Sequence, residues 1–161
     1  MMNRRNMLIG GTAAAVAGWH FWRTPAEAGS KATFEITKTE DEWRKILTKQ
    51  QFYVLRKHGT ERAFTHPLND NKRDGTYHCA GCDLPLYSSK TKYDSRTGWP
   101  SFWAPIENAV GTSTDYFIGY PRTEVHCRRC GGHLGHVFND GPPPTGKRHC
   151  INGVSLKFVA A

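Results

Sequence analysis

Two Cys-x-x-Cys pairs with 44 residues between them constrain the fold of this 161-residue chain more than any other feature. The pairs are Cys79/Cys82 and Cys127/Cys130, with a glycine in or directly after each. This spacing lets both thiolates of a pair reach one ion, and four thiolates complete the tetrahedral ligand set of a structural zinc site. The gap exceeds the roughly 15–20 residues of a compact zinc ribbon. The sequence therefore predicts an ion that joins two distant parts of one larger domain.

The first 28 residues have the pattern of an export signal. Arg4 and Arg5 precede an apolar run over 7–22 without acidic side chains, and Ala26-x-Ala28 resembles a cleavage site. Paired arginines resemble the twin-arginine signal of bacteria, so we expect a periplasmic or otherwise exported protein. An uncleaved membrane anchor is the alternative, although the run is shorter than the roughly 20 residues that span a bilayer. We predict a signal over 1–28, a short linker over 29–38 and one folded domain over 39–160.

Export bears on the state of the four paired cysteines. Exported proteins normally favour disulfides, which are the alternative to zinc here. A twin-arginine cargo crosses the membrane already folded, so zinc could bind in the reducing cytoplasm first, and we favour zinc. A thioredoxin-like redox pair is less consistent with the sequence, because neither pair follows a strand and opens a helix.

The positive charge says little about partners. Residues 1–28 carry three arginines and one glutamate, so the net charge falls from +8 for the whole chain to +6 without them. A zinc-ribbon protein that grips nucleic acid through Arg128 and Arg129 is one alternative function. An export signal argues against it, as does the lack of a basic helix or RNP-like motif, so we expect no nucleic-acid binding.

The pattern along the remaining chain predicts a mainly β (α+β) domain with a helical N-terminal flank. Thr39 with Glu42 and Thr48 with Gln51 form two capping boxes, each followed by apolar residues at helical spacing, which predicts two short helices within 39–58. Beyond Pro67, short β-rich runs alternate with Gly, Pro and Asn/Asp clusters. We expect strands near 76–79, 116–120, 124–127 and 155–159, and a rigid surface loop over 141–146.

Cys150 is the cysteine that the two pairs leave over. Lys147, Arg148 and His149 directly precede it, and a cationic setting favours the nucleophilic thiolate. In an extended segment Asn152 would lie on the same side as Cys150 and could hydrogen-bond the group that the thiolate attacks. A buried structural cysteine is the alternative, and it is the commoner case.

Two further groups of residues are candidates for a site. His133 and His136 could serve as general acids or metal ligands, and a nearby zinc site would hold them rigidly. A hydrolase with these histidines on a catalytic zinc lacks a recognisable third ligand and gives Cys150 no role. Trp99 and Phe102 belong to an aromatic cluster over 98–103, which forms either plain core or an apolar pocket.

Residues from about 39 to 159 resemble the type B methionine-R-sulfoxide reductases (MsrB). Beside the cysteine pairs, the matching motifs are Glu42-Trp43, Tyr53-Val54-Leu55-Arg56, His58-Gly59-Thr60-Glu61-Arg62, Pro67-Leu68-Asn69, Gly98–Phe102, His133–Phe138 and Arg148-x-Cys150-Ile151-Asn152. The resemblance implies a catalytic domain of two antiparallel sheets in a barrel-like fold, with short N-terminal helices. It also implies one structural zinc on the four paired cysteines.

The resemblance further implies a reaction. The Cys150 thiolate would attack the sulfur of methionine-R-sulfoxide, in free or, as is usual in the family, protein-bound form. His136 would protonate the departing oxygen with help from His133, and Cys150 would remain as a sulfenic acid. The remaining implied roles are substrate binding at Trp99 and Phe102, and a supporting polar network of Asn152, Arg148 and Asp140.

One departure from the family pattern bears on how the enzyme would be recycled. Many members carry a resolving cysteine just before the Gly-Trp-Pro-Ser-Phe run, where this chain has Thr97. We therefore expect a one-cysteine type, reduced directly by a thioredoxin-like or other external thiol, that acts as a monomer in the repair of oxidised proteins. His149, where Tyr or Phe is usual, and Gly153-Val154, where Ser-Ala is common, are smaller departures.

Overall fold

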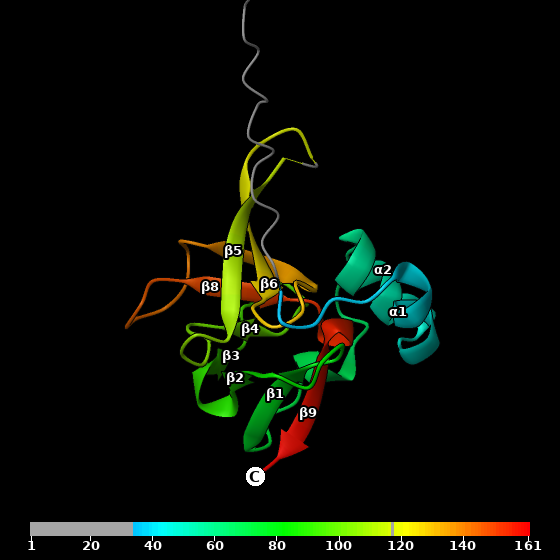
Figure 1. The fold of residues 1–161 in the computed structure, drawn as a ribbon. Helices are drawn as coiled ribbons and strands as arrows, with labels where there is room; N and C mark the ends of the chain where they lie inside the picture. The colour runs from blue at the N-terminus through cyan, green and yellow to red at the C-terminus, as the bar shows by residue number, and fades with distance from the viewer. Residues whose placement is uncertain (1–33, 117) are drawn as a thin grey trace, which may run out of the picture. The chain divides into compact units, whose positions relative to one another are not determined.

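The computed structural model describes residues 34–116 and 118–161, drawn in colour in Figure 1. The predicted signal over 1–28 and residues 29–33 of the predicted linker lie outside the described residues. Within the described part of the chain, no helix is both long enough and apolar enough to cross a membrane.

Both predicted helices are confirmed, as α1 (Glu40–Ile46) and α2 (Lys49–Lys57). In each capping box the threonine hydroxyl accepts from the backbone N–H three residues on, at 3.3 Å in α1 and 3.2 Å in α2. The Glu42 carboxylate and the Gln51 amide oxygen accept from the backbone N–H of the capping threonines in return. These contacts are local, which is why the sequence alone predicts both helix starts.

Over the described residues, nine antiparallel strands form two sheets. The three-stranded sheet has the order β2-β1-β9, with β1 (Gly75–Cys79), β2 (Pro85–Ser88) and β9 (Leu156–Ala160). The six-stranded sheet has the order β3-β4-β8-β7-β6-β5. Its members are β3 (Lys92–Tyr93), β4 (Ser101–Phe102), β5 (Val110–Asp115), β6 (Arg122–Cys127), β7 (His133–Phe138) and β8 (Arg148–Ile151). The same part of the chain has three single-turn 3₁₀ helices: η1 (Pro67–Asn69), η2 (Ser89–Thr91) and η3 (Gly153–Ser155).

Three of the four predicted strands are confirmed, and the prediction for 116–120 is wrong. Strand β5 ends at Asp115, and the backbone N–H of Gly119 donates to the carbonyl of Tyr116 to close the turn before β6. Gly119 has a φ of 86° and Pro121 has no N–H, so the aromatic run cannot continue a strand. The predicted surface loop over 141–146 does join β7 to β8.

The core lies between the two sheets. Phe102 of the six-stranded sheet stacks on Tyr87 at a ring-centroid distance of 4.3 Å and meets the edge of Tyr77 at 5.0 Å, both from the three-stranded sheet. All three rings are fully buried. The mainly β fold of two antiparallel sheets with short N-terminal helices is thus confirmed.

Candidate active site

One row of side chains crosses the whole six-stranded sheet. In antiparallel pairs, directly opposed residues lie on the same face, with Cβ atoms about 5 Å apart. The register joins, strand by strand, Ser113 to Glu124, Glu124 to His136, His136 to Cys150, Cys150 to Ser101 and Ser101 to Tyr93. The sheet therefore places Cys150 directly between His136 and Ser101.

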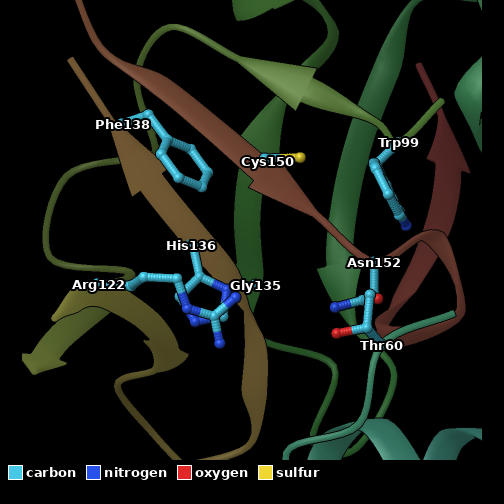
Figure 2. Close-up of a pocket in the computed structure, with 8 residues that line it drawn as sticks. All are labelled: Thr60, Trp99, Arg122, Gly135, His136, Phe138, Cys150 and Asn152. Carbon is cyan, nitrogen blue, oxygen red and sulfur yellow. The ribbon is translucent and has the colours of Figure 1, made fainter. Parts of the chain in front are cut away.

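A cavity of about 130 Å³ opens over the centre of this row. Figure 2 shows Cys150 on β8 with its sulfur directed toward the side of Trp99, and His136 on the neighbouring strand β7. The lining residues come from β6, β7, β8 and the loops around them: Thr60, Trp99, Arg122, Gly135, His136, Phe138, Cys150 and Asn152.

The environment of Cys150 corrects the predicted cationic setting. Burial raises the pKa of the thiol above its ordinary value of 9.0, and a hydrogen bond with Thr97 and the charge of Arg148 only partly oppose this. Arg148 is held in a bidentate ion pair by Asp140, with both N–O distances at 2.9 Å. Most of the expected activation is therefore absent from the free protein, in which the thiol is the favoured form.

The other two basic neighbours of Cys150 point elsewhere. His149 lies on the opposite face of β8, where its Nδ1 is 3.2 Å from the Tyr87 hydroxyl, and burial lowers its pKa to about 4. It is thus neutral near pH 7. Lys147 donates to the side chain of Asn139 at 2.6 Å. Charges adjacent in sequence alternate between faces of a strand, so only Arg148 remains on the side of the sulfur.

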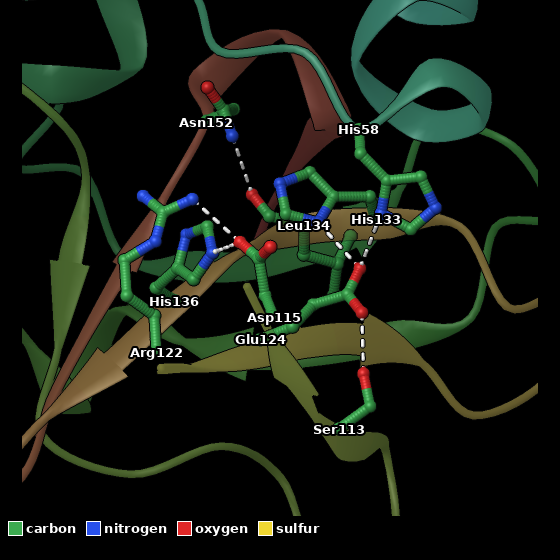
Figure 3. Close-up of polar contacts among 9 residues, drawn as sticks. All are labelled: His58, Ser113, Asp115, Arg122, Glu124, His133, Leu134, His136 and Asn152. Atoms are coloured by element: carbon green, nitrogen blue, oxygen red, sulfur yellow. Dashed lines mark hydrogen bonds and ion pairs between the residues drawn. The ribbon is translucent and has the colours of Figure 1, made fainter. Parts of the chain in front are cut away.

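His136 is held by a carboxylate that the sequence analysis did not identify. Its Nε2 lies 2.7 Å from Asp115 Oδ2, and the same oxygen accepts from Arg122 at 2.6 Å (Figure 3). Burial lowers the pKa of His136, while the hydrogen bond to Asp115 opposes that shift. Asp115 therefore fixes the ring and favours the imidazolium that an acid catalyst requires.

His133 lies behind His136 and does not line the cavity. The two rings have centroids 5.3 Å apart, and His133 is only 1% exposed, with its Nδ1 2.7 Å from Glu124 Oε1. Glu124 also accepts from Ser113 at 2.5 Å and pairs with His58 at 3.0 Å. Burial disfavours the ionised carboxylate, but these three hydrogen bonds outweigh it and hold the pKa of Glu124 far below its ordinary value.

The two histidines that a hydrolase would place on one metal ion have different carboxylate partners. His136 binds Asp115 and His133 binds Glu124, each at 2.7 Å. The potential ligand atoms of His58, Glu124 and His133 do lie within 4.8 Å of one another. Two charge-assisted hydrogen bonds to one carboxylate oxygen account for that proximity.

Asn152 connects three segments of the chain at the cavity. Its side-chain amide donates to the carbonyl of Leu134 on β7 at 2.9 Å, and its Oδ1 accepts from the backbone N–H of Glu61 at 2.9 Å. It is 4% exposed and lies at the cavity wall, as predicted for a residue two positions beyond Cys150. Its hydrogen bonds tie β8 to β7 and to the segment after α2.

The two predicted aromatic residues have different places. Trp99 lines the cavity, and its indole N–H donates to the carbonyl of Glu61 at 3.2 Å. The Glu61 carboxylate in turn accepts from the backbone N–H groups of Gly153 and Val154, at 2.6 and 2.9 Å. Phe102 alternates to the core face of its strand and is absent from the cavity wall, so the structure corrects its assignment to substrate binding.

The four paired cysteines form one cluster that can hold a metal ion. Their sulfurs all lie within 4.8 Å of one another, with 3.8 Å between Cys79 and Cys130 and 3.5 Å between Cys82 and Cys127. A tetrahedral zinc with bonds of about 2.3 Å separates its sulfurs by about 3.8 Å, so the residues fit this group. None of the five cysteines forms a disulfide in the structure, which disfavours the disulfide alternative. Each pair begins at the last residue of a strand, β1 or β6, and continues into a turn.

Sequence reasoning missed Thr60, Asp115, Arg122 and Glu124. Three of them lie on the β5–β6 hairpin, where side chains at alternate positions face the site. Polar alternation over 122–126 was the available signal, because Arg122, Glu124 and His126 are spaced by two. The position of Asp115, Arg122 and Glu124 beside His136 depends on the pairing of β6 with β7, which no local pattern reveals.

Comparison with known proteins agrees with this geometry. The SelR domain model matches residues 47–160. The chain is 58% identical to the peptide methionine sulfoxide reductase MsrB of Pseudomonas putida, over 77% of this chain and 94% of that protein. It is 53% identical to the protein of the same name from Leptospira interrogans, over 78% and 96% of the two chains. With the chloroplastic peptide methionine sulfoxide reductase B1 of rice it shares 54% identity, over 80% of this chain and 60% of the rice protein. Given a family match over most of its length, this chain belongs to the SelR-domain family, the MsrB family of peptide methionine sulfoxide reductases.

Proposed function

We propose that this chain is a methionine sulfoxide reductase that converts methionine-R-sulfoxide, mainly in oxidised proteins, to methionine through Cys150. The observation that carries the proposal is the direct opposition of Cys150 and His136 on β8 and β7 at the floor of one cavity. A nucleophile and an acid in this relation match the chemistry named for the relatives. The choice of the R epimer follows from the resemblance to type B enzymes.

In the proposed reaction, the Cys150 sulfur attacks the sulfoxide sulfur, and negative charge grows on the oxygen. The His136 imidazolium protonates that oxygen as the sulfur–oxygen bond breaks. The protonated oxygen passes to the Cys150 sulfur as the bond between the two sulfurs breaks. The substrate sulfur thereby gains two electrons and leaves as methionine, while Cys150 loses two and becomes a sulfenic acid. Trp99 forms the wall against which the terminal methyl of the substrate packs.

The second half of the cycle uses an external thiol. Four of the five cysteines belong to the metal cluster, and Thr97 Oγ1 lies 3.8 Å from the Cys150 sulfur. This supports a one-cysteine mechanism, in which two electrons from a thioredoxin-like or other thiol reduce the sulfenic acid and release water. We place the donor outside the chain because no other cysteine is part of the cavity wall.

The proposed metal is one structural zinc on Cys79, Cys82, Cys127 and Cys130. When bound, it would stabilise the four thiolates and hold the two turns together, with no part in the reaction. The cluster joins β1 of one sheet to β6 of the other, which supports a structural role.

The proposed location is the periplasm, reached through the signal over 1–28. The paired arginines, the apolar run and Ala26-x-Ala28 support this. N-terminal sequencing of the protein from a periplasmic fraction is expected to start at Gly29. An intact N-terminus in the membrane fraction would instead indicate the uncleaved anchor.

The test of the proposed activity uses the separate epimers of a methionine sulfoxide peptide with a dithiol reductant. The wild-type protein is expected to reduce the R epimer only, and Cys150→Ser to lose the activity while keeping its metal content. Tyr53→Ser, at an exposed position of α2, is a matched control that should keep full activity. Activity that survives Cys150→Ser would refute the mechanism.

A further inference from the structure

A chain of hydroxyl groups ends at the Cys150 sulfur. Thr97 Oγ1 lies 3.8 Å from the sulfur, Ser95 Oγ lies 2.8 Å from Thr97 Oγ1, and Ser101 Oγ lies 2.7 Å from Ser95 Oγ. The far end is a carbonyl, because Ser101 Oγ donates to the backbone oxygen of Trp99 at 3.1 Å. Ser95, Thr97 and Trp99 all come from the loop between β3 and β4, and Ser101 is fully buried on β4.

The number of hydroxyl hydrogens fixes the direction of each hydrogen bond in this row of hydroxyl groups. Each hydroxyl has one hydrogen, and a carbonyl only accepts. If Ser101 donates to the Trp99 carbonyl, Ser95 must donate to Ser101, and Thr97 must donate to Ser95. Thr97 then has no hydrogen for the sulfur, and its oxygen can accept one from the Cys150 S–H. In this arrangement the hydroxyl groups stabilise the neutral thiol.

Reversal of the three hydroxyls gives the opposite fit. Ser101 then donates to Ser95, Ser95 to Thr97, and Thr97 to the sulfur, at the cost of the bond to the Trp99 carbonyl. A thiolate can only accept, so this second arrangement fits the ionised cysteine. No oxygen needs to move between the two states, because each hydroxyl hydrogen reaches its new acceptor by rotation about one bond.

We propose that Thr97, Ser95 and Ser101 form a reversible hydroxyl relay that turns with the ionisation of Cys150, with Thr97 as the group that donates to the thiolate. The relay rests on the proposed function only in taking Cys150 as the nucleophile. Thr97 contacts the reacting atom, while Ser95 and Ser101 are positioning residues. The thiol proton itself leaves through the cavity, and none passes along the relay.

Other charged or titratable groups also face Cys150 and must be kept constant. Arg148 and Asp140 act on it from β8 and from the loop after β7, Tyr93 from β3, and His136 from β7. The Tyr93 hydroxyl is buried and has no hydrogen-bond partner in the described part of the chain. Substitutions within the relay leave these four side chains unchanged, so a shift in the thiol pKa reports on the hydroxyls.

The test measures the rate at which iodoacetamide alkylates Cys150 as a function of pH, read by mass spectrometry of the Cys150 peptide. Thr97→Val keeps the shape and removes the donor, so the thiol pKa should rise by about half a unit and alkylation near pH 7 should slow about threefold. Thr97→Ser keeps the hydroxyl and should restore the wild-type profile.

The direction of the relay gives a second, opposite expectation. Ser101→Ala removes the link to the Trp99 carbonyl and frees Thr97 to donate to the sulfur, so the pKa should fall. Ser95→Ala breaks the same link at a partly exposed position and should lower the pKa in the same way. This variant replaces Ser101→Ala if the buried substitution prevents folding. An unchanged pKa in Thr97→Val, or a rise in both serine variants, would overturn the relay.

Alkylation needs no methionine sulfoxide, so the relay and the proposed function fail separately. Wild-type protein that reduces neither epimer, with the relay shifts intact, would refute the function alone. Normal reduction of the R epimer without those shifts would refute the relay alone.

Discussion

A single proton decides whether the Cys150 and His136 side chains can react. Burial raises the pKa of the thiol and lowers the pKa of the imidazole, so near pH 7 the favoured state is a neutral thiol beside a neutral ring. The productive pair, thiolate and imidazolium, holds the same one proton. The thiolate–imidazolium pair is therefore the less populated of two arrangements that share one proton. Its population changes with pH only when the pair gains or loses a proton.

This proton count predicts a broad pH profile of kcat/KM. A second proton binds below the pKa of His136, under its ordinary value of 6.5, and the single proton is lost above the pKa of Cys150, over its ordinary value of 9.0. We expect a plateau between these limits and a fall on both sides, measured in steady-state assays at constant ionic strength. An alkaline limb below the ordinary thiol value would contradict the effect of burial on Cys150.

Asp115→Asn tests the carboxylate that holds His136. Asp115 raises the pKa of the ring, so its loss should lower that pKa further and move the acidic limb to lower pH. Fewer imidazolium rings at neutral pH should reduce kcat/KM by at least about tenfold. Glu40→Gln is the matched control, because Glu40 is also a carboxylate with two basic partners, but on the exposed face of α1. A lower rate with an unmoved acidic limb would leave Asp115 a purely structural role.

Much of the chemistry at single residues is predictable from the sequence, while its electrostatics is not. Cys150, His136 and Trp99 are predicted from their residue types and motifs, and all three line the cavity. The expected activation by Lys147, Arg148 and His149 is largely wrong, because strand alternation and burial remove two of the three charges from the sulfur. Sequence neighbours predict charge near a residue only when the backbone places them on the same face.

At the level of elements, the site depends on the close approach of β7 to β8. A Cβ at Gly135 would lie 2.1 Å from the carbonyl oxygen of Cys150, so only glycine lets the two strands pair there. Gly135 stands opposite Ile151, one residue from both His136 and Cys150. Any widening at this point would separate the nucleophile from the acid.

Gly135→Ala should therefore impair stability and activity together. The clash involves backbone atoms that cannot move aside, and we expect a loss of about 3 kcal/mol in the free energy of unfolding, measured in urea. Gly146→Ala is the control, because Gly146 has no neighbour within 4 Å and only a strained φ of +67°. It should cost about 1 kcal/mol and leave kcat/KM unchanged. Equal losses in both variants would show that strand approach is not limiting.

Element prediction succeeded where the signals are local. The capping boxes at Thr39 and Thr48 specify both helices through contacts three residues apart. Strands β3 and β4 have two residues each, too few for any alternation, and β7 includes glycine and histidine in place of β-branched residues. Such strands form because their neighbours in the sheet pair with them, and this information is distributed over the whole chain.

Across the whole molecule, the cysteine cluster joins the two sheets at the ends of β1 and β6. The long interval between the pairs, which the sequence shows directly, matches a bond between separate sheets. The metal would therefore stabilise the packing of the sheets, while the site row lies entirely within the six-stranded sheet.

Loss of the metal should destabilise the protein as a whole. We expect one zinc per chain in the purified protein, and Cys82→Ser should lose the metal and lower the Tm by about 10 °C or more. Cys150→Ser removes a thiol outside the cluster and should keep both metal content and Tm. A Cys82→Ser protein with full zinc and an unchanged Tm would contradict the structural role of the cluster.

The most direct test of the central claim is a single turnover of the R-sulfoxide peptide without any reductant. We expect one methionine per chain and one oxygen atom on the Cys150 peptide, where mass spectrometry after chemical trapping should detect a sulfenic acid. A disulfide between Cys150 and another cysteine of the chain would contradict the one-cysteine mechanism. Methionine formed without any change at Cys150 would contradict its role as the nucleophile.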